Sequence, residues 1–413
     1  MMQRTAISVL GQRAPHPLRK AGPAAAVRSL YIHVPFCAHK CHYCDFYSLV
    51  DTQDRQEAFV SRLCSELEAL SEATGAPGLE TIFIGGGTPS LLGVPLWRRL
   101  LSELERRFDL WAMRPGGGGE FTVECNPESV TRELLDVLVA GGVSRVSMGA
   151  QSFNRRHLAT LERRHDPAEV SRAIDAARAV GIRRQSIDLI SSIPGQTVSE
   201  LREDLSAAVG LGTSHLSCYT LTYEPRTAMT ARLERGEFAR ADEETEIEMF
   251  EVTLGAMRAA GLERYEVSNF ARPGQECRHN LAYWRQEEWL AAGPSASGHV
   301  AGHRWKNVPR LDDYLAGAGL PEVVDHEPPD ARRALAERIM TGLRLAEGLA
   351  WEWVRGRAAE VCGAASAARL DRVAGAAMER EQATIVGGRL RLTDAGFLLA
   401  DTIAADLMRA LRA

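Results

Sequence analysis

The sequence has no apolar run that approaches the roughly 18 residues needed to cross a lipid bilayer, which excludes a membrane-spanning helix. It has no surplus of positive charge either, because 49 Lys and Arg face 54 Asp and Glu and leave a formal net charge of -5. Without a basic face, the protein is unsuited to binding a nucleic acid. Cysteine is scarce, with 8 in 413 residues, so the chain is not a disulfide scaffold. We therefore expect reduced cysteines and a cytoplasmic protein.

Three of those cysteines are close together, in the spacing Cys37-x3-Cys41-x2-Cys44 after the apolar run 31–36. Thiolates are soft ligands that suit iron–sulfur clusters or zinc. A cubane cluster has four irons, so three cysteines leave one iron open to a small molecule. A structural zinc site would instead be closed by a fourth ligand, for which the candidates are His33, His39 and His42. A third interpretation is three reduced cysteines in the core.

From residue 28 onward, strand and helix patterns alternate. Apolar runs typical of buried strands occupy 29–36, 80–84, 120–124, 145–151, 185–190 and 215–221. Between them, apolar residues at helical spacing predict helices over 53–73, 94–107, 129–140, 167–180 and 199–211. Six strand–helix units in a row predict an α/β fold, a partial (β/α)6 barrel with its helices outside. The chemistry of such barrels lies at the carboxyl ends of the strands, where the sequence places Cys37, Gly86, Glu124, Gln151, Asp188 and Tyr223.

Two kinds of residue at these strand ends are informative. The turn Gly85-Gly86-Gly87-Thr88 lets the backbone approach a ligand closely, although a tight turn without a ligand explains it equally well. It is not a phosphate loop, because no Gly-Lys-Ser/Thr follows. Glu124 and Asp188 end apolar strands, where an unpaired carboxylate is costly to bury. We expect them to meet either a ligand, such as ribose hydroxyls, or a buried cation such as Arg145 or Arg184.

A second group of polar and aromatic residues lies in His279-Asn280-Leu-Ala-Tyr283-Trp284, after a helix predicted over 242–260. Such density is unusual in a chain with 6% aromatic residues. Tyr283 follows His279 by one helical turn, so this pair could bind a metal and flank a flat ring. The alternative is a helix cap with an aromatic contact in the core.

The predicted domains are a barrel over 28–265, a connecting segment with this motif over 266–329 and a C-terminal domain over 330–413. Pro328-Pro329 marks the last boundary. The C-terminal domain is predicted to hold helices over 331–343, 349–365 and 370–381, a hairpin over 383–392 and a helix from 393 to about 409. It resembles a winged-helix module, for which we expect a lid or partner-docking role. Residues 1–27 are basic and lack acidic residues, and we predict a disordered extension rather than a transit peptide.

The motifs together resemble one branch of the radical S-adenosylmethionine (SAM) superfamily, that of the oxygen-independent coproporphyrinogen III oxidases and the HemW-type heme chaperones. The resemblance covers residue 28 to the C-terminus. It rests on the three-cysteine loop and on Phe83-Ile-Gly-Gly-Gly-Thr-Pro-Ser, Val123-Glu-Cys-Asn-Pro, Ser147-Met-Gly-Ala-Gln-Ser-Phe and Tyr265-Glu-Val-Ser-Asn-Phe-Ala.

The resemblance implies a [4Fe–4S] cluster held by Cys37, Cys41 and Cys44. In the superfamily the open iron binds SAM, which is then cleaved to a deoxyadenosyl radical. The residues implied to surround this SAM are Tyr31, Gly86, Glu124, Gln151, Arg163 and Asp188. Those that match contacts to a second SAM in the oxidases are Tyr43, Gly87 and Thr88.

Two features separate the oxidases from the chaperones. The oxidases carry a fourth cysteine two residues after the third, where this sequence has Phe46. The chaperones carry His-Asn-x-x-Tyr-Trp, which is complete here and implies that His279 contacts heme, for which imidazole is a common axial ligand. One departure is that the family's Gly-Pro-Gly-Ala-His reads Gly-Pro-Ser-Ala-Ser over 293–297, without the histidine.

The resemblance therefore implies a heme chaperone that uses a [4Fe–4S] cluster, SAM and heme. Its implied partners are an electron donor and acceptor heme proteins, by analogy respiratory ones. The alternative is an oxidase that decarboxylates coproporphyrinogen III to protoporphyrinogen IX. A third hypothesis is a zinc-stabilised binding module without SAM chemistry.

Overall fold

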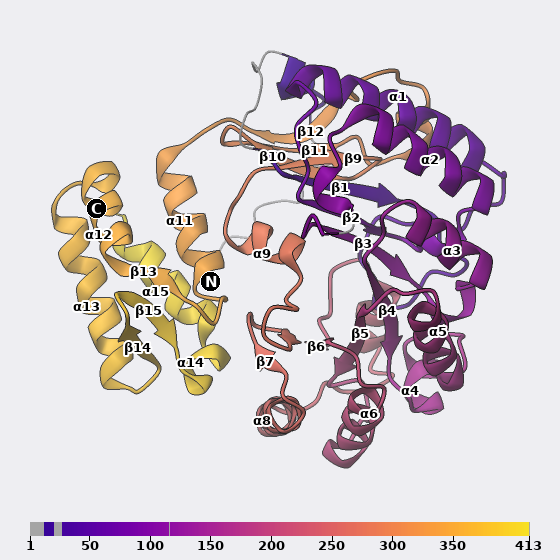
Figure 1. Ribbon diagram of the computed structural model, residues 1–413. Helices are drawn as coiled ribbons and strands as arrows, with labels where there is room; N and C mark the ends of the chain where they lie inside the picture. The colour runs from indigo at the N-terminus through magenta and orange to yellow at the C-terminus, as the bar shows by residue number, and fades with distance from the viewer. Residues whose placement is uncertain (1–11, 20–26, 115, 413) are drawn as a thin grey trace.

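The computed structural model describes residues 12–19, 27–114 and 116–412 (Figure 1). Its main element is a 12-stranded sheet in the order β12-β11-β10-β9-β1-β2-β3-β4-β5-β6-β8-β7. The central strands run parallel and are β1 (Ser29–Val34), β2 (Thr81–Gly86), β3 (Glu120–Cys125), β4 (Arg145–Gln151), β5 (Arg184–Ser191) and β6 (His215–Thr220). These six strands confirm the predicted partial (β/α)6 barrel.

Helices connect the parallel strands and cover the outer side of the curved sheet (Figure 1). They are α1 (Gln56–Thr74), α2 (Val94–Arg107), α3 (Arg132–Ala140), α4 (Arg155–Thr160), α5 (Pro167–Ala179) and α6 (Val198–Gly210). Short 3-10 turns lie at η2 (Pro89–Leu91), η3 (Trp111–Met113) and η4 (Pro127–Ser129). Asp166 and Thr197 begin α5 and α6 with capping boxes, which satisfy the free N–H groups of the first turn. The helices and strands share one core, so the strand ends are rigidly placed.

The segment 266–329 is not the simple connection that the sequence predicts. It contains β8 (Asn269–Ala271), α9 (Arg278–Trp284), β9 (Trp289–Ala292), β10 (Ser297–Val300), β11 (His303–Asn307), α10 (Leu311–Leu315) and β12 (Val323–Glu327). Strand β9 pairs in parallel with β1, and β10 to β12 continue the sheet beyond it. On the other edge, β8 and β7 (Glu263–Arg264) extend the sheet from β6, after helices α7 (Ala228–Glu234) and α8 (Glu243–Ala259). The unpaired edges of β1 and β6 recruit these short strands.

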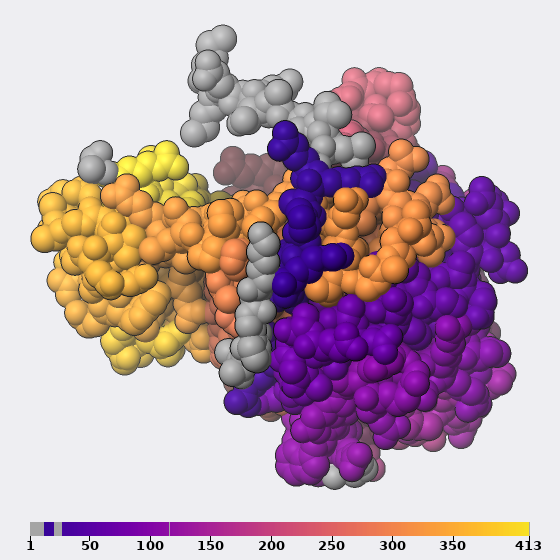
Figure 2. All heavy atoms as spheres, turned by 90° about the horizontal axis from the view of Figure 1, so that it is seen from above, coloured from indigo at the N-terminus to yellow at the C-terminus, as the bar shows by residue number. Residues whose placement is uncertain are grey.

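The C-terminal unit has a hydrophobic core of its own and lies beside the barrel (Figures 1 and 2). Its helices are α11 (Ala331–Gly342), α12 (Trp351–Cys362), α13 (Ala365–Glu379), α14 (Asp394–Leu398) and α15 (Ala400–Ala410). Its sheet has the order β13-β15-β14, with β13 (Leu349–Ala350), β14 (Ala383–Val386) and β15 (Arg389–Leu392).

Two predictions for this unit are wrong. Residues 349 and 350 do not begin a helix, because they pair with β15. The final helix is not continuous but is interrupted at Leu399. The described part of the chain contains no helix long and apolar enough to cross a membrane.

The prediction of a disordered N-terminal extension is wrong for residues 12–19. Ala14 forms a bridge with Val323 of β12, and the short turn η1 (Pro17–Arg19) follows. His16 and Leu18 are buried, and the His16 ring packs edge-on against Trp305, with centroids 4.8 Å apart. Figure 2 shows this indigo segment lying over the orange strands. The remainder of the predicted extension, 1–11 and 20–26, lies outside the described residues.

Candidate functional site

The three clustered cysteines lie on the loop that follows β1. Backbone hydrogen bonds close this loop, from Cys37 N to Leu49 O at 2.9 Å and from Leu49 N to Pro35 O at 2.8 Å. Lys40 Nζ braces the interior of the loop by donating to Phe46 O at 2.6 Å and to Ser48 Oγ at 2.9 Å. The closed loop turns Cys37, Cys41 and Cys44 toward one cavity of about 850 Å³.

The donor set in this cavity includes three free thiols. Three thiolates can bind three irons of a cubane cluster, whereas a structural zinc site would need a fourth ligand beside them. Burial raises the pKa of Cys44 to about 11, so a bound metal has to displace that proton.

The three histidines considered as a fourth zinc ligand have other partners. His33 contacts Tyr31 Oη through Nδ1 at 3.1 Å and Tyr47 O through Nε2 at 2.7 Å. His42 Nδ1 lies 3.2 Å from Arg232. His39 Nε2 lies 3.4 Å from a carboxylate oxygen of Glu162. Both ring nitrogens of His33 are therefore engaged, whereas His39 lines the cavity together with the three cysteines and stays a candidate fourth ligand.

The glycine turn after β2 is packed against the cysteine loop. A Cβ on Gly87 would lie 2.5 Å from Phe36 O, and one on Gly86, whose φ is +108°, would lie 2.5 Å from the His33 ring. Backbone hydrogen bonds of 2.7 Å join Gly87 N to Val34 O and Thr88 N to Phe36 O. The glycines are therefore required by the packing, and they also line the large cavity. The packing accounts for the glycines, and a ligand beside the turn stays a prediction.

Glu124 and Asp188 face the same cavity from β3 and β5. Glu124 accepts a 3.0 Å hydrogen bond from Gly86 N, and burial together with the Asp188 charge raises its pKa to about 7. Asp188 accepts from serine hydroxyls at 2.7 Å (Ser217), 3.0 Å (Ser147) and 3.3 Å (Ser186), while burial raises its pKa. Within the described ranges neither carboxylate forms an ion pair with Arg145 or Arg184, so that alternative is wrong.

Gln151 and Arg163 line the cavity from the end of β4 and from the loop that follows it. Gln151 has φ of +64° at a register shift between β4 and β5. Arg163 donates to Gly149 O at 2.7 Å and to Asn126 Oδ1 at 3.1 Å, and lies 3.9 Å from Cys41 Sγ. Its guanidinium is therefore fixed beside a thiol that would carry negative charge with a metal bound.

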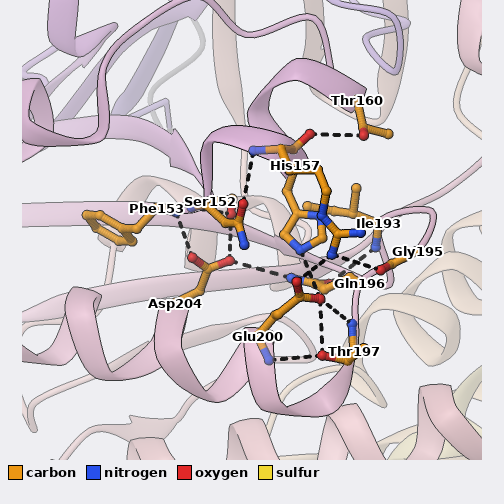
Figure 3. Close-up of polar contacts among 12 residues, drawn as sticks. Ser152, Phe153, His157, Thr160, Ile193, Gly195, Gln196, Thr197, Glu200 and Asp204 are labelled. Carbon is orange, nitrogen blue, oxygen red and sulfur yellow. Dashed lines mark hydrogen bonds and ion pairs between the residues drawn. The ribbon is translucent and has the colours of Figure 1, made fainter.

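A buried polar network that begins at Ser152, the residue after Gln151, escapes the sequence analysis (Figure 3). Asp204 of α6 accepts from Ser152 Oγ at 2.6 Å and from Phe153 N at 2.7 Å. The adjacent His157 is buried and lies 3.3 Å from Glu200. The Gln-Ser-Phe part of the strand-four motif was the available signal, but the sequence does not show that α6 supplies the carboxylate. The network holds the strained backbone of Gln151 in place.

Two tyrosines predicted at the site have different positions. Tyr43 lines the large cavity beside the cysteines, and burial raises its pKa. Tyr223 is not among the residues that line it; its ring packs near Phe238 and under the Arg240 guanidinium, 4.4 Å away. Thr222 and Glu224 on either side of it do line the cavity, so the chain passes the site at Tyr223 but its ring packs elsewhere, and the placement of this side chain at the site is wrong.

A second cavity of about 550 Å³ lies inside the barrel and shares Glu124, Ser147 and Asp188 with the first. Its wall is aromatic, with contacts that run from Tyr31 through Phe83, His279 and Tyr283 to Trp289. Because the two cavities have walls in common, a ligand in one lies close to a ligand in the other.

His279 lines this interior cavity and is buried, with 1% of its surface exposed. Its Nδ1 lies 2.8 Å from Thr81 Oγ1 and its Nε2 lies 2.9 Å from Tyr283 Oη. Burial lowers its pKa to about 4, so the ring is neutral. These contacts match the alternative interpretation of the motif, in which His279 makes an aromatic contact in the core. A metal could bind Nε2 only if the Tyr283 hydroxyl moved away from it.

The substituted segment 293–297 borders the same cavity through Ser295 and Ser297. Gly293 N and Asn307 Nδ2 donate to the buried Glu66 at 2.9 and 2.8 Å, which fixes the segment to α1. Ser297 therefore occupies part of the wall where the family's motif has a histidine, and Ser295 stands where the motif has a glycine.

Comparisons with known proteins agree with this geometry. The family model of the radical SAM superfamily matches residues 31–208. Over 392 residues the chain is 37% identical to the heme chaperone HemW of Mycobacterium tuberculosis, covering 92% of this chain and 94% of that protein. Over 327 residues it is 35% identical to the heme chaperone HemW of Bacillus subtilis, covering 78% and 85%.

Among solved structures, the coproporphyrinogen III oxidase HemN from Escherichia coli, a radical SAM enzyme, superposes with a TM-score of 0.79. The match covers 94% of this chain and 91% of that chain at 21% identity, and it shows a shared fold. The chain belongs to the radical SAM superfamily and, within it, to the HemW family.

Proposed function

We propose that this protein is a heme chaperone that holds a [4Fe–4S] cluster and SAM in the large cavity, binds heme and passes it to acceptor heme proteins. The observation that carries the proposal is the pair of adjoining cavities, one lined by three free cysteines and one by aromatic residues. The curated relatives over most of the chain are named heme chaperones, which supports the same function.

The residues of the large cavity fit the cluster and SAM. Cys37, Cys41 and Cys44 would hold the cluster, which when bound supplies the electron for reductive cleavage of SAM. The residues proposed to surround the cleaved SAM are Gly86, Glu124, Gln151, Arg163 and Asp188, which line this cavity, and Tyr31, which lines the adjoining interior cavity. Tyr43, Gly87 and Thr88 line the large cavity at the positions that match contacts to a second SAM in the oxidases. Carboxylates and backbone amides at these positions match the hydroxyl, amino and carboxylate groups that SAM presents.

Heme is proposed to use the interior cavity, with His279 as the candidate axial ligand. The cavity has the size of a small-molecule site and the flat apolar wall that a porphyrin ring needs. Phe46, with 65% of its surface exposed, stands where the oxidases carry a fourth cysteine and lines both cavities. This replacement favours the chaperone over the oxidase. We place the protein in the cytoplasm, with an electron donor and respiratory heme proteins as partners.

The test is a heme titration of the anaerobically reconstituted full chain, followed by absorbance. His279→Ala is the test variant and His303→Ala on the surface of β11 is its control. Saturable binding that weakens only in His279→Ala supports the proposal and its site. Equal binding in all three proteins removes the role of His279.

Two further measurements separate the alternatives. Catalytic formation of protoporphyrinogen IX from coproporphyrinogen III would replace the chaperone proposal with the oxidase. Zinc in place of iron and labile sulfide in the purified protein would replace both with a zinc-stabilised module.

A further inference from the structure

Arg145, at the beginning of β4, is a buried cation with no partner in the protein. Only 2% of its surface is exposed, yet it forms no hydrogen bond and no ion pair within 4.0 Å among the described residues. Its side chain lines the interior cavity. A guanidinium carries five N–H donors, and leaving them unpaired in the interior is costly.

The neighbouring strand shows how such a charge is normally satisfied. Arg184 is the register partner of Arg145 on β5, and it lies 2.9 Å from Glu120 Oε2 and donates to Glu276 O at 2.8 Å. Arg184 is not among the residues that line the cavity. The two arginines therefore differ in their partners: Arg184 contacts protein acceptors, whereas Arg145 faces the cavity.

The acidic groups around Arg145 are already engaged by other donors. Glu120 accepts from the backbone N–H groups of Arg278 and His279, at 3.0 and 3.1 Å, in addition to its ion pair. Asp188 accepts from the serine hydroxyls described above. Burial lowers the pKa of Arg145, but the nearby groups Cys277, Glu120 and Asp188 outweigh burial and raise the pKa, so the guanidinium stays charged. Neither carboxylate forms an ion pair with it among the described residues.

We propose that Arg145 binds a carboxylate of the ligand that enters the interior cavity. The ligand is a flat apolar ring system that carries carboxylate groups, because the same cavity offers one buried guanidinium and a wall of aromatic side chains. This inference rests on the proposed function, in which the ligand is heme and the carboxylate is one of its propionates. A guanidinium matches a carboxylate with two parallel hydrogen bonds, which orients the ring as well as holding it.

The test compares heme with iron protoporphyrin IX dimethyl ester, in which both propionates are neutral. Each ligand is titrated into the anaerobically reconstituted full chain as wild type, Arg145→Met and Arg184→Met. We expect Arg145→Met to weaken heme binding by about tenfold to a hundredfold, the range of a hydrogen bond between charged groups. The same variant should bind the dimethyl ester as the wild type does, and Arg184→Met should leave the ratio of the two affinities unchanged.

The experiment distinguishes an error about Arg145 from an error about the proposed heme chaperone function. Saturable binding of heme by the wild type with the same affinity in Arg145→Met overturns the role of Arg145 and leaves the chaperone proposal standing. Equal weakening of heme and ester in Arg145→Met also overturns it, because the loss is then unrelated to the carboxylate. A wild type that binds neither ligand overturns both proposals. Arg145→Lys, which keeps the charge, should recover part of the heme affinity, and cluster absorbance and thermal unfolding check that each variant is folded.

Discussion

The network behind Gln151 gives a prediction that can be worked out from its contacts. Asp204→Ala removes the acceptor of the Ser152 hydroxyl and of the Phe153 N–H, which lie 2.6 and 2.7 Å from its two oxygens. Ser152 has none of its surface exposed, and Asp204 has 2% exposed, so water cannot replace the lost acceptor. Each buried group left without a partner costs about 1–3 kcal/mol. Removing a buried carboxylate recovers part of this, so we expect the free energy of unfolding to fall by about 2–4 kcal/mol.

The same substitution should also weaken SAM binding. Gln151 adjoins Ser152 and has φ of +64°, a conformation that persists only where the surroundings hold it. Once Asp204 no longer holds the backbone, Gln151 and the Gly149 carbonyl that accepts from Arg163 are free to shift. We expect the dissociation constant of SAM to rise by about tenfold, which corresponds to roughly 1.4 kcal/mol of lost positioning.

Urea unfolding measures the first effect, and calorimetric titration of SAM into the reconstituted protein measures the second. Glu203→Ala, an exposed carboxylate one residue earlier on α6, is the matched control and should change neither quantity. Asp204→Asn keeps one oxygen acceptor and should lie between Asp204→Ala and the wild type. The reasoning is refuted if Asp204→Ala changes stability by less than about 0.5 kcal/mol, or if it is destabilised yet binds SAM normally while folded.

Three other predictions concern the loop, the buried carboxylate and the domain contact. Gly87→Ala would place a Cβ 2.5 Å from a backbone oxygen of the cysteine loop, so iron and sulfide analysis should show reduced cluster content. Gly93→Ala is the control, because its Cβ would lie 3.9 Å from its nearest neighbour, and it should match the wild type. Because the pKa of Glu124 is raised from 4.5 to about 7, the folded state binds this proton more tightly than the unfolded chain. Relative to Glu124→Gln, the free energy of unfolding in urea should fall as pH rises from about 4.5 to about 7, by up to roughly 3 kcal/mol, and then level off. Arg264→Ala removes a guanidinium that lies 3.6 Å from the centre of the Phe397 ring, and should lower the unfolding temperature by about 1–2 °C in a thermal scan.

The barrel was predictable because its strands carry their own signal. Parallel strands covered on both faces read as continuous apolar runs, and the bounds of β4 and α2 agree with the predicted ranges 145–151 and 94–107. The strands over 289–327 were missed for the opposite reason. They are four or five residues long and include Gly, Ser, His and charged residues, and they are stable because β1 offers a free edge. Such pairing is a property of the assembled sheet and leaves no local pattern.

The residues of the candidate site likewise fall into a group that the sequence predicts and a group that it does not. The sequence places Cys37, Gly86, Glu124 and Asp188 at strand ends, and the structure brings them to one cavity because the carboxyl ends of parallel strands share one edge. Their roles toward the cluster and SAM stay predictions. The sequence could not predict that Asp204 on a distant helix supports Gln151, since this depends on α6 lying beside Ser152 and Phe153, which follow β4.

The large cavity is completed only by the C-terminal unit. Residues 397–402, at the junction of α14 and α15, line it opposite the cysteine loop and the strand ends. This junction reaches the cavity because the final helix is interrupted at Leu399. Arg264 also fixes it, because its guanidinium lies over the Phe397 ring and donates to Asp394 Oδ1 at 2.8 Å. A continuous helix would carry these residues along its axis instead of turning them toward the barrel. The interruption that the sequence analysis missed is therefore the feature by which residues of a separate core come to line the large cavity.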